Sequence, residues 1–251
     1  MTWAALIIPP DLGTPVTLVL FGASFVASFI ATTFGIGGGA LLLAVMAALM
    51  PPAVLIPVHG IVQLGSNASR AAAMILHFVN WRDLGAFTAG SVVGVAIGGM
   101  IVINISPAWV QLGVAVFIVW SIFVRPPAWL RHWPVLTGGF SSFLTMFFGA
   151  SGLFVASYTK SLALDRHKHV ATHASLMTVQ HLLKTLAFGF LGFSFGPWLG
   201  FTIAMIAAGL AGTLAGRLAL NRLTDARFKT ALDVLLLLIA ARLFWAGLQA
   251  L

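Results

Sequence analysis

The stretch that decides the fold begins with Thr32-Thr33-Phe34-Gly35-Ile36-Gly37-Gly38-Gly39. It continues through an apolar segment to Arg70. The segment after the glycines carries His59, Gln63 and Asn67 as well as Arg70. Consecutive glycines interrupt a helix, and positions separated by 4, 8 and 11 residues fall near one helical face. The stretch therefore predicts a helix broken at the glycines, followed by a helix with a single polar stripe.

Composition places this stretch in a membrane. Of the 251 residues, 60% are hydrophobic and only 7% are charged, whereas about a quarter of a soluble domain is charged. The chain has no cysteine, which excludes disulfides, thiolate metal sites and cysteine nucleophiles. The formal charge of +8 reflects basic residues at a cytoplasmic membrane face and does not indicate nucleic acid as a partner.

The fold class predicted is an all-α polytopic membrane protein. Segments of about 20 apolar residues are long enough to cross the bilayer. Hydrophobic segments lie at about 16–50, 54–79, 84–104, 108–124, 135–163, 169–193, 198–220 and 228–250. The first is interrupted by the triple glycine and the fifth at Gly149-Ala150-Ser151-Gly152. We divide the chain into an N-terminal tail (1–15), a first membrane repeat (16–124), a cytoplasmic linker (125–134) and a second membrane repeat (135–250).

The two repeats align without a gap at an offset of 114 residues. Polar residues inside membrane segments are rare, so polar pairs in register carry more weight than apolar ones. The aligned pairs are Phe34-Gly35 with Phe148-Gly149, His59 with His173, Asn67 with His181, Arg70 with Lys184, Phe87-Thr88 with Phe201-Thr202, and Gly98 with Gly212. The alignment predicts an internal duplication of four segments.

Most basic residues lie in the connections after the second, fourth, fifth and seventh segments. Eight full spans would put these connections on both membrane faces, against the positive-inside rule. They share the cytoplasmic face if the first segment of each repeat enters the membrane, turns at its glycines and leaves on the same side. The repeats are then inverted, Pro51-Pro52 lies outside and Asp165-Arg166 inside. Eight full spans with parallel repeats are the alternative.

Arg70 and Lys184 predict an anion site. Both lie within apolar segments, where a cation is costly unless paired or hydrated, and the few aspartates lie at ends or in connections. We expect the two cations to bind the charge of an anionic ligand and Asn67, Gln63 and His181 to orient its oxygens. The alternative is that each cation extends to an interface or caps backbone carbonyls.

The glycine turns predict backbone donors for the same anion. A broken helix exposes N–H groups at the start of its second limb, where the helix dipole favours negative charge. The residues expected to contribute are Gly37, Gly38, Gly39, Ser151 and Gly152. Tight helix packing by small residues is the alternative explanation of these glycines. His59 and His173 are candidates for proton coupling, against a purely structural role in the core.

Catalytic motifs do not occur in this sequence. It contains no carboxylate pair, no metal-spaced cluster and no Gly-x-Ser-x-Gly nucleophile turn. We therefore predict neither an enzyme nor a bound metal or cofactor.

Five features of the sequence belong together: the glycine motif at Phe34–Gly39, the Pro51-Pro52 turn, the polar second segment, the Asn80-Trp81 turn and the glycine-rich third segment. In this combination the chain resembles the sulfite exporter TauE/SafE family, also called the toluenesulfonate uptake permease family. The resemblance covers nearly the whole chain and implies a multi-pass protein of the bacterial inner membrane. It implies secondary transport, as an exporter, of a small sulfur-containing anion such as sulfite or an organosulfonate. A passive anion channel is the alternative. The expected partners are this anion, the lipid bilayer and, as one option, a second copy of the chain.

Overall fold

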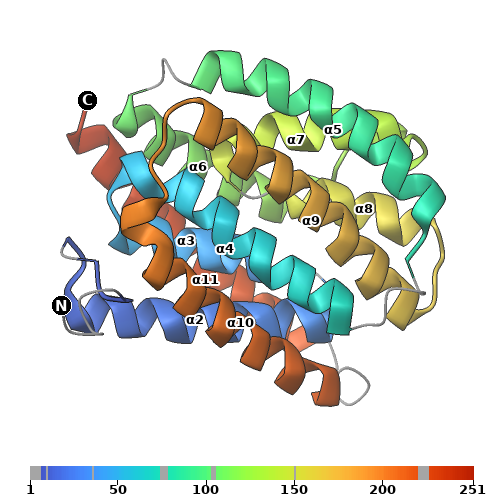
Figure 1. Cartoon of the computed structure of the whole chain (residues 1–251), viewed down its shortest axis with the longest axis horizontal. Coiled ribbons are helices and arrows are strands. Elements are labelled where there is room, and N and C mark those ends of the chain that lie inside the picture. Colours follow the sequence, from blue (N-terminus) through green and yellow to red (C-terminus); the bar gives the residue numbers. More distant parts are fainter. Residues whose placement is uncertain are drawn as a thin grey trace.

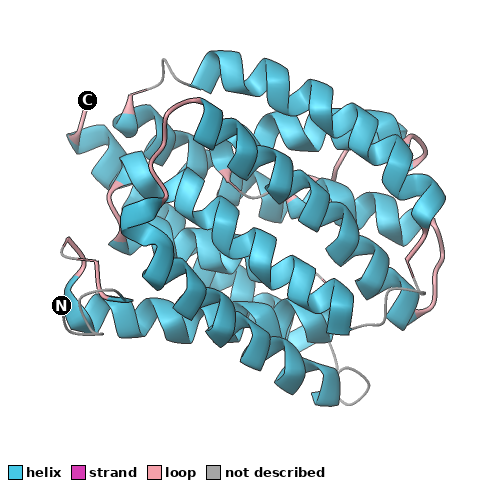
Figure 2. Cartoon of the chain, viewed as in Figure 1, coloured by secondary structure: helices cyan, strands magenta, loops and turns pink. Residues whose placement is uncertain are grey.

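The computed structural model of the chain describes residues 7–9, 11–35, 37–73, 79–102, 106–149, 151–219 and 226–251. Over these residues the chain is a bundle of helices (Figure 1; Figure 2). The helices are α2 (Gly13–Phe34), α3 (Gly38–Leu49), α4 (Pro52–Ala73), α5 (Trp81–Val102), α6 (Pro107–Phe123), η2 (Ala128–Arg131), α7 (Pro134–Phe148), α8 (Gly152–Ser161), α9 (Arg166–Phe190), η3 (Gly196–Trp198), α10 (Leu199–Ala219) and α11 (Ala226–Gln249). Part of the predicted tail (residues 1–6 and 10), Ile36, Ala150 and the connection 220–225 lie outside the described residues.

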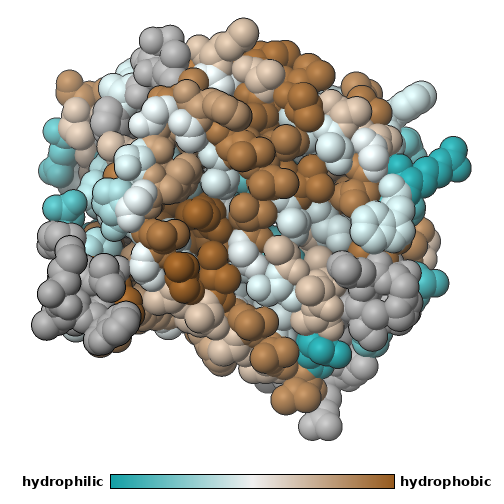
Figure 3. Space-filling model, in the orientation of Figure 1, coloured by the Kyte–Doolittle hydropathy of each residue, from teal (hydrophilic) through white to brown (hydrophobic). Residues whose placement is uncertain are grey.

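The protein is a multi-pass membrane protein. By length and apolar composition, the helical stretches Gly13–Phe34, Trp81–Val102, Gly196–Ala219 and Leu232–Gln249 are able to cross a membrane. Large apolar side chains are exposed on these helices, as at Leu18, Met100, Leu218 and Trp245. Figure 3 shows the apolar surface across the middle of the molecule and hydrophilic groups toward its left and right edges. This distribution fits a bilayer around the middle of the bundle.

The first hydrophobic segment breaks at the glycines, as predicted. Gly35 and Gly37 have φ values of +80° and +95°, in the left-handed region that glycine tolerates. After the turn α3 folds back along α2, because Gly38 packs against Ala27, about two helical turns before the end of α2.

The second repeat breaks and reverses in the same way. Gly149 has φ +73° between α7 and α8. The rings of Phe140 on α7 and Phe154 on α8 lie 5.1 Å apart, and Ser161 Oγ at the end of α8 donates to the Arg131 carbonyl at 2.5 Å. The α7–α8 hairpin therefore ends beside the connection from which it starts. Because α2 has 22 residues, enough to cross the bilayer alone, the re-entrance of the first segment stays a prediction.

The halves interleave instead of forming separate bodies. The first segment of each half packs on the third segment of the other, α2 on α10 and α7 on α5. The second segments, α4 and α9, pack on one another, and so do the fourth segments, α6 and α11. Residues from both halves consequently meet along the α4–α9 contact in the interior.

The offset of 114 residues holds only through the second segment. Helix α3 starts at Gly38 and α8 at Gly152, 114 residues later, whereas α5 starts at Trp81 and α10 at Leu199, 118 residues later. A four-residue shift therefore separates the second from the third segment of the two halves.

Glycine packing gives the same corrected register. Gly94 packs against the Gly139 carbonyl of α7, and Gly212 packs against the Phe25 carbonyl of α2. Gly94 is thus the counterpart of Gly212, and the predicted pairs Gly98 with Gly212 and Phe87 with Phe201 are wrong. Apolar matches could not reveal the shift, because most residues in these segments are apolar.

The connection from α8 to α9, which carries Arg166, lies at the end of the bundle opposite the chain termini, which we call the basic end (Figure 1). The start of α2, the end of α11 and the connection from α9 to α10 lie at the left of Figure 1, and the connection from α8 to α9 lies at the right. At this right-hand end, Arg166 donates to the Thr33 carbonyl at 2.6 Å. The grouping of all the basic connections on one membrane face stays a prediction.

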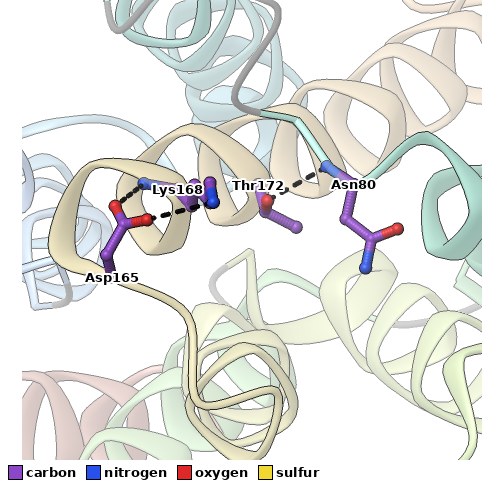
Figure 4. Close-up of polar contacts among 4 residues, drawn as sticks. All are labelled: Asn80, Asp165, Lys168 and Thr172. Carbon is purple, nitrogen blue, oxygen red and sulfur yellow. Dashed lines mark hydrogen bonds and ion pairs between the residues drawn. The ribbon is translucent and has the colours of Figure 1, made fainter.

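The Asn80-Trp81 turn is attached to the start of α9 (Figure 4). Asp165 caps α9 by accepting from the Lys168 N–H at 3.0 Å, a bond that lowers the pKa of Asp165. One turn further, Thr172 Oγ1 accepts from the Asn80 N–H at 3.3 Å. These contacts join the α4–α5 connection to the second half.

Single-cysteine labelling tests the predicted sidedness, because the natural chain contains no cysteine. Ala53 is exposed at the start of α4, and His132 is exposed after η2. We expect a membrane-impermeant maleimide to label Ala53→Cys in intact cells and His132→Cys only in inverted vesicles. Labelling of both variants from the same side would contradict the inverted topology.

Candidate functional site

A cavity of about 660 Å³ lies between the two halves. Its walls come from the start of α3, one face of α4, the end of α6, and parts of α8, α9 and α11. The glycine, polar and charged lining residues are Gly35, Gly37, Gly38, Gly39, His59, Gln63, Asn67, Arg70, Ser121, Arg125, Arg131, Gly152, Ser157, Lys160, His173, His181 and Asp233.

The polar stripe of α4 forms a hydrogen-bonded chain along one wall. Gln63 Nε2 lies 3.4 Å from His59 Nε2, and Asn67 Nδ2 donates to Gln63 Oε1 at 3.0 Å. Arg70 Nη1 in turn donates to Asn67 Oδ1 at 3.0 Å. The predicted helical face is confirmed, since all four side chains are buried and line the same cavity.

Arg70 ends this chain without a counter-ion among the described residues. Its side chain is 3% exposed, and its Nε donates to Thr32 Oγ1 at 3.2 Å. Its hydrogen-bond partners among the described residues, Thr32 and Asn67, are both neutral side chains. A buried guanidinium whose charge is not matched by a carboxylate favours an anion in the adjoining cavity.

Lys184 has a different environment from its sequence counterpart. It is fully buried, and its Nζ donates to the Gly149 carbonyl at 3.1 Å. It is outside the cavity lining, so this cation holds the turn of the α7–α8 hairpin and does not face the open space. The structure thus brings only one of the two predicted charge-binding residues to the cavity wall.

The N-terminal ends of α3 and α8 both border the cavity, through Gly38, Gly39 and Gly152. The first N–H groups of a helix have no partner within it and favour an anion. The neighbouring glycines differ, however, in what a side chain would meet. A Cβ at Gly39 would lie 3.1 Å from the Gln63 side chain, and one at Gly38 would lie 1.9 Å from the Ala27 backbone oxygen.

Ser151 lies behind the cavity wall. It is fully buried, is outside the cavity lining and accepts a hydrogen bond from Gln180 Nε2. The same amide group of Gln180 donates to the Ser141 carbonyl at 3.4 Å. Gln180 therefore positions the second glycine turn, a role that its place beside the α9 stripe did not reveal.

The histidines meet across the α4–α9 contact. The rings of His59 and His181 lie 6.0 Å apart in an edge-to-face arrangement, and His59 Nε2 lies 3.3 Å from the Gly39 carbonyl oxygen. His173 stacks on His169, with ring centroids 6.3 Å apart. The Nδ1 atoms of His173 and His181 are buried without a hydrogen-bond partner among the described residues, so each is able to accept a proton or contact a ligand.

The cavity reaches the surface at the basic end of the bundle. Phe123, Val124, Arg125 and Lys160 line it and are exposed. Toward the other end the space is closed by a buried apolar cluster from α3 and the start of α4, with Leu42, Leu43, Met46, Leu55 and Val58 each at most 2% exposed. Over the part of the chain that the structure describes, the exposed lining residues named above mark an opening at the basic end.

Sequence reasoning missed the charged residues near this opening. Arg125 and Arg131 belong to a basic connection that was used only to predict topology, and no role was predicted for Lys160. Their meeting depends on the reversal of α8, which no spacing in the sequence expresses.

One family model, described as "Sulfite exporter TauE/SafE", matches residues 20–243 of the chain. No curated protein and no solved structure matches the chain. The match covers most of the described bundle, from within α2 to within α11.

Proposed function

Because the chain belongs to the sulfite exporter TauE/SafE family, we propose that it is a secondary transporter that exports sulfite or a small organosulfonate across the bacterial inner membrane. The observation that carries this proposal is Arg70, a cation 3% exposed on the wall of a cavity of about 660 Å³ and bonded only to neutral partners among the described residues. A small anion entering the cavity supplies the missing charge.

We propose that the anion binds between Arg70 and the N-terminal end of α3. Asn67 and Gln63 lie on the same wall as Arg70 and orient the oxygens of the anion, together with His181. Gly152 extends the site from the second half. Lys184 acts through the hairpin, since its bond to the Gly149 carbonyl fixes the start of α8, and Ser151 acts in the same way through Gln180.

Alternating access requires an alternative arrangement of the two halves. The exchange of first and third segments between halves supports an inverted repeat, a plan shared by many transporters. With the basic end in the cytoplasm, the cavity described above is the inward-facing state. The apolar cluster of α3 and α4 then forms the closed outer gate, and opening it requires the two halves to move relative to one another.

His59 offers a means of coupling transport to protons. Its Nε2 lies near both the Gly39 carbonyl oxygen and the Gln63 amide nitrogen. A protonated Nε2 donates to the carbonyl, whereas an unprotonated one accepts from the amide. A proton on this atom therefore selects between a contact to the glycine turn and a contact to the α4 stripe. His173, on the facing wall, is the second proposed titrating group.

Counterflow in liposomes tests this function. With the reconstituted full-length protein, we expect saturable uptake of radiolabelled sulfite that accelerates when the lumen contains unlabelled sulfite. Acceleration arises because a carrier returns faster when loaded, whereas a passive channel dissipates the gradient without it. Protein-free liposomes provide the background. Uptake that does not saturate, together with large single-channel currents, would favour the channel alternative.

A further inference from the structure

Three cations surround the opening of the cavity. Arg125 follows α6, Arg131 ends η2 and Lys160 lies one residue before the end of α8. The bond from Ser161 Oγ to the Arg131 carbonyl, 2.5 Å long, fixes the end of α8 on η2 and so keeps Lys160 and Arg131 together. We call these three residues the mouth cluster.

The charges of the mouth cluster are not neutralised within the described part of the chain. No ion pair is formed by any of the three there, and the Nε of Arg131 is buried without a hydrogen-bond partner. The described lining contains four Arg or Lys residues, these three and Arg70, but only one carboxylate, Asp233. The cavity consequently attracts anions along its whole length.

The mouth cluster differs from Arg70 in exposure, because Arg125 and Lys160 are exposed whereas Arg70 is 3% exposed. Helix α8 has its first residue, Gly152, at the deep part of the cavity and Lys160 at the opening. Eight residues of helix correspond to about 12 Å. Apolar residues, including Phe117, Leu153 and Leu236, also line the cavity. The mouth cluster therefore meets an anion at the surface of the protein, and Arg70 meets it inside the cavity.

We infer that Arg125, Arg131 and Lys160 form a second anion-binding site, which captures the substrate from the cytoplasm before it passes to Arg70. The inference rests on the transport function proposed above. Exposed charges attract an anion most strongly at low salt, because the Debye length falls to about 10 Å at 0.1 M ionic strength. The site therefore raises the rate of capture without contributing to the maximal rate of translocation.

Uptake of radiolabelled sulfite into inverted membrane vesicles, where the cytoplasmic face is outward, tests the site. In the Arg125→Gln/Arg131→Gln/Lys160→Gln variant we expect the half-saturating sulfite concentration to rise about tenfold, within the 10- to 1,000-fold range of electrostatic steering, with an unchanged maximal rate. The salt dependence of the half-saturating concentration should largely disappear. In right-side-out vesicles the variant and the natural protein should behave alike.

The matched control removes three exposed cations that lie outside the cavity lining, in the Arg82→Gln/Lys168→Gln/Arg217→Gln variant. It should retain the natural half-saturating concentration. Lys160→Gln alone provides a milder variant if the triple change impairs folding, and an elevated half-saturating concentration is expected there too. Equal effects of the two triple variants, or none from either, would overturn the mouth site alone. Absence of saturable uptake by the natural protein would overturn the transport function and this inference together.

Discussion

Replacing Arg70 by glutamine is expected to reduce sulfite transport about 100-fold or more, from a loss of roughly 3 kcal/mol of charge-assisted hydrogen bonding to the anion. Glutamine preserves much of the side-chain length but removes the charge. Because Arg70 has only neutral partners among the described residues, no buried carboxylate is left unpaired by the change. The measurement is the initial rate of radiolabelled sulfite uptake over a range of concentrations, at matched protein incorporation.

Lys184→Gln provides the comparison that separates binding from support of the hairpin. Its ammonium is bonded to the Gly149 carbonyl, so its loss should lower the thermal stability of the purified protein. Arg70→Gln should leave thermal stability nearly unchanged, and Arg70→Lys should retain partial transport, since lysine keeps the charge but not the planar fork. Arg70→Gln with the natural rate and half-saturating concentration would contradict the proposed anion site.

The features that the sequence predicted correctly follow from local covalent geometry. The α4 stripe was predictable because the helical repeat places His59, Gln63, Asn67 and Arg70 on one face whatever surrounds them. The breaks were predictable because glycine adopts a positive φ without strain. Gly35, Gly37 and Gly149 all have positive φ in the structure.

The features that sequence could not predict depend on how distant segments pack. Lys184 has the same position in α9 as Arg70 has in α4, but the Gly149 carbonyl of the reversed hairpin lies next to its ammonium. The four-residue shift before α10 became visible from the starts of α5 and α10 and from the contact of Gly212 with the Phe25 carbonyl. The mouth cluster likewise depends on the contact between α8 and η2. None of these contacts between distant segments alters the spacing of polar and apolar residues from which a sequence prediction is made.

Replacing Gly38 by alanine is expected to destabilise the α2–α3 hairpin. A Cβ at this position would lie 1.9 Å from the Ala27 backbone oxygen and 2.8 Å from the Ala31 Cβ, so helix backbones must separate. Overpacking costs typically 1–3 kcal/mol and occasionally more, which corresponds to a decrease of about 2–12 °C in the unfolding temperature of a chain this size. Thermal unfolding in detergent, followed by tryptophan fluorescence, measures the decrease.

Gly39→Ala is the matched control because it makes the same substitution at the next residue of the same motif. Its Cβ would meet the Gln63 side chain, at 3.1 Å, and not a neighbouring backbone, so the change requires a small shift of the Gln63 amide. We expect Gly39→Ala to unfold near the natural temperature but to raise the half-saturating sulfite concentration, because the moved amide belongs to the anion site. Equal stability of the two variants would show that Gly38 does not hold α3 against α2. Gly38 packs against backbone atoms of α2, whereas Gly39 faces the Gln63 side chain. Adjacent glycines thus have different roles, one in closing the hairpin and one in binding.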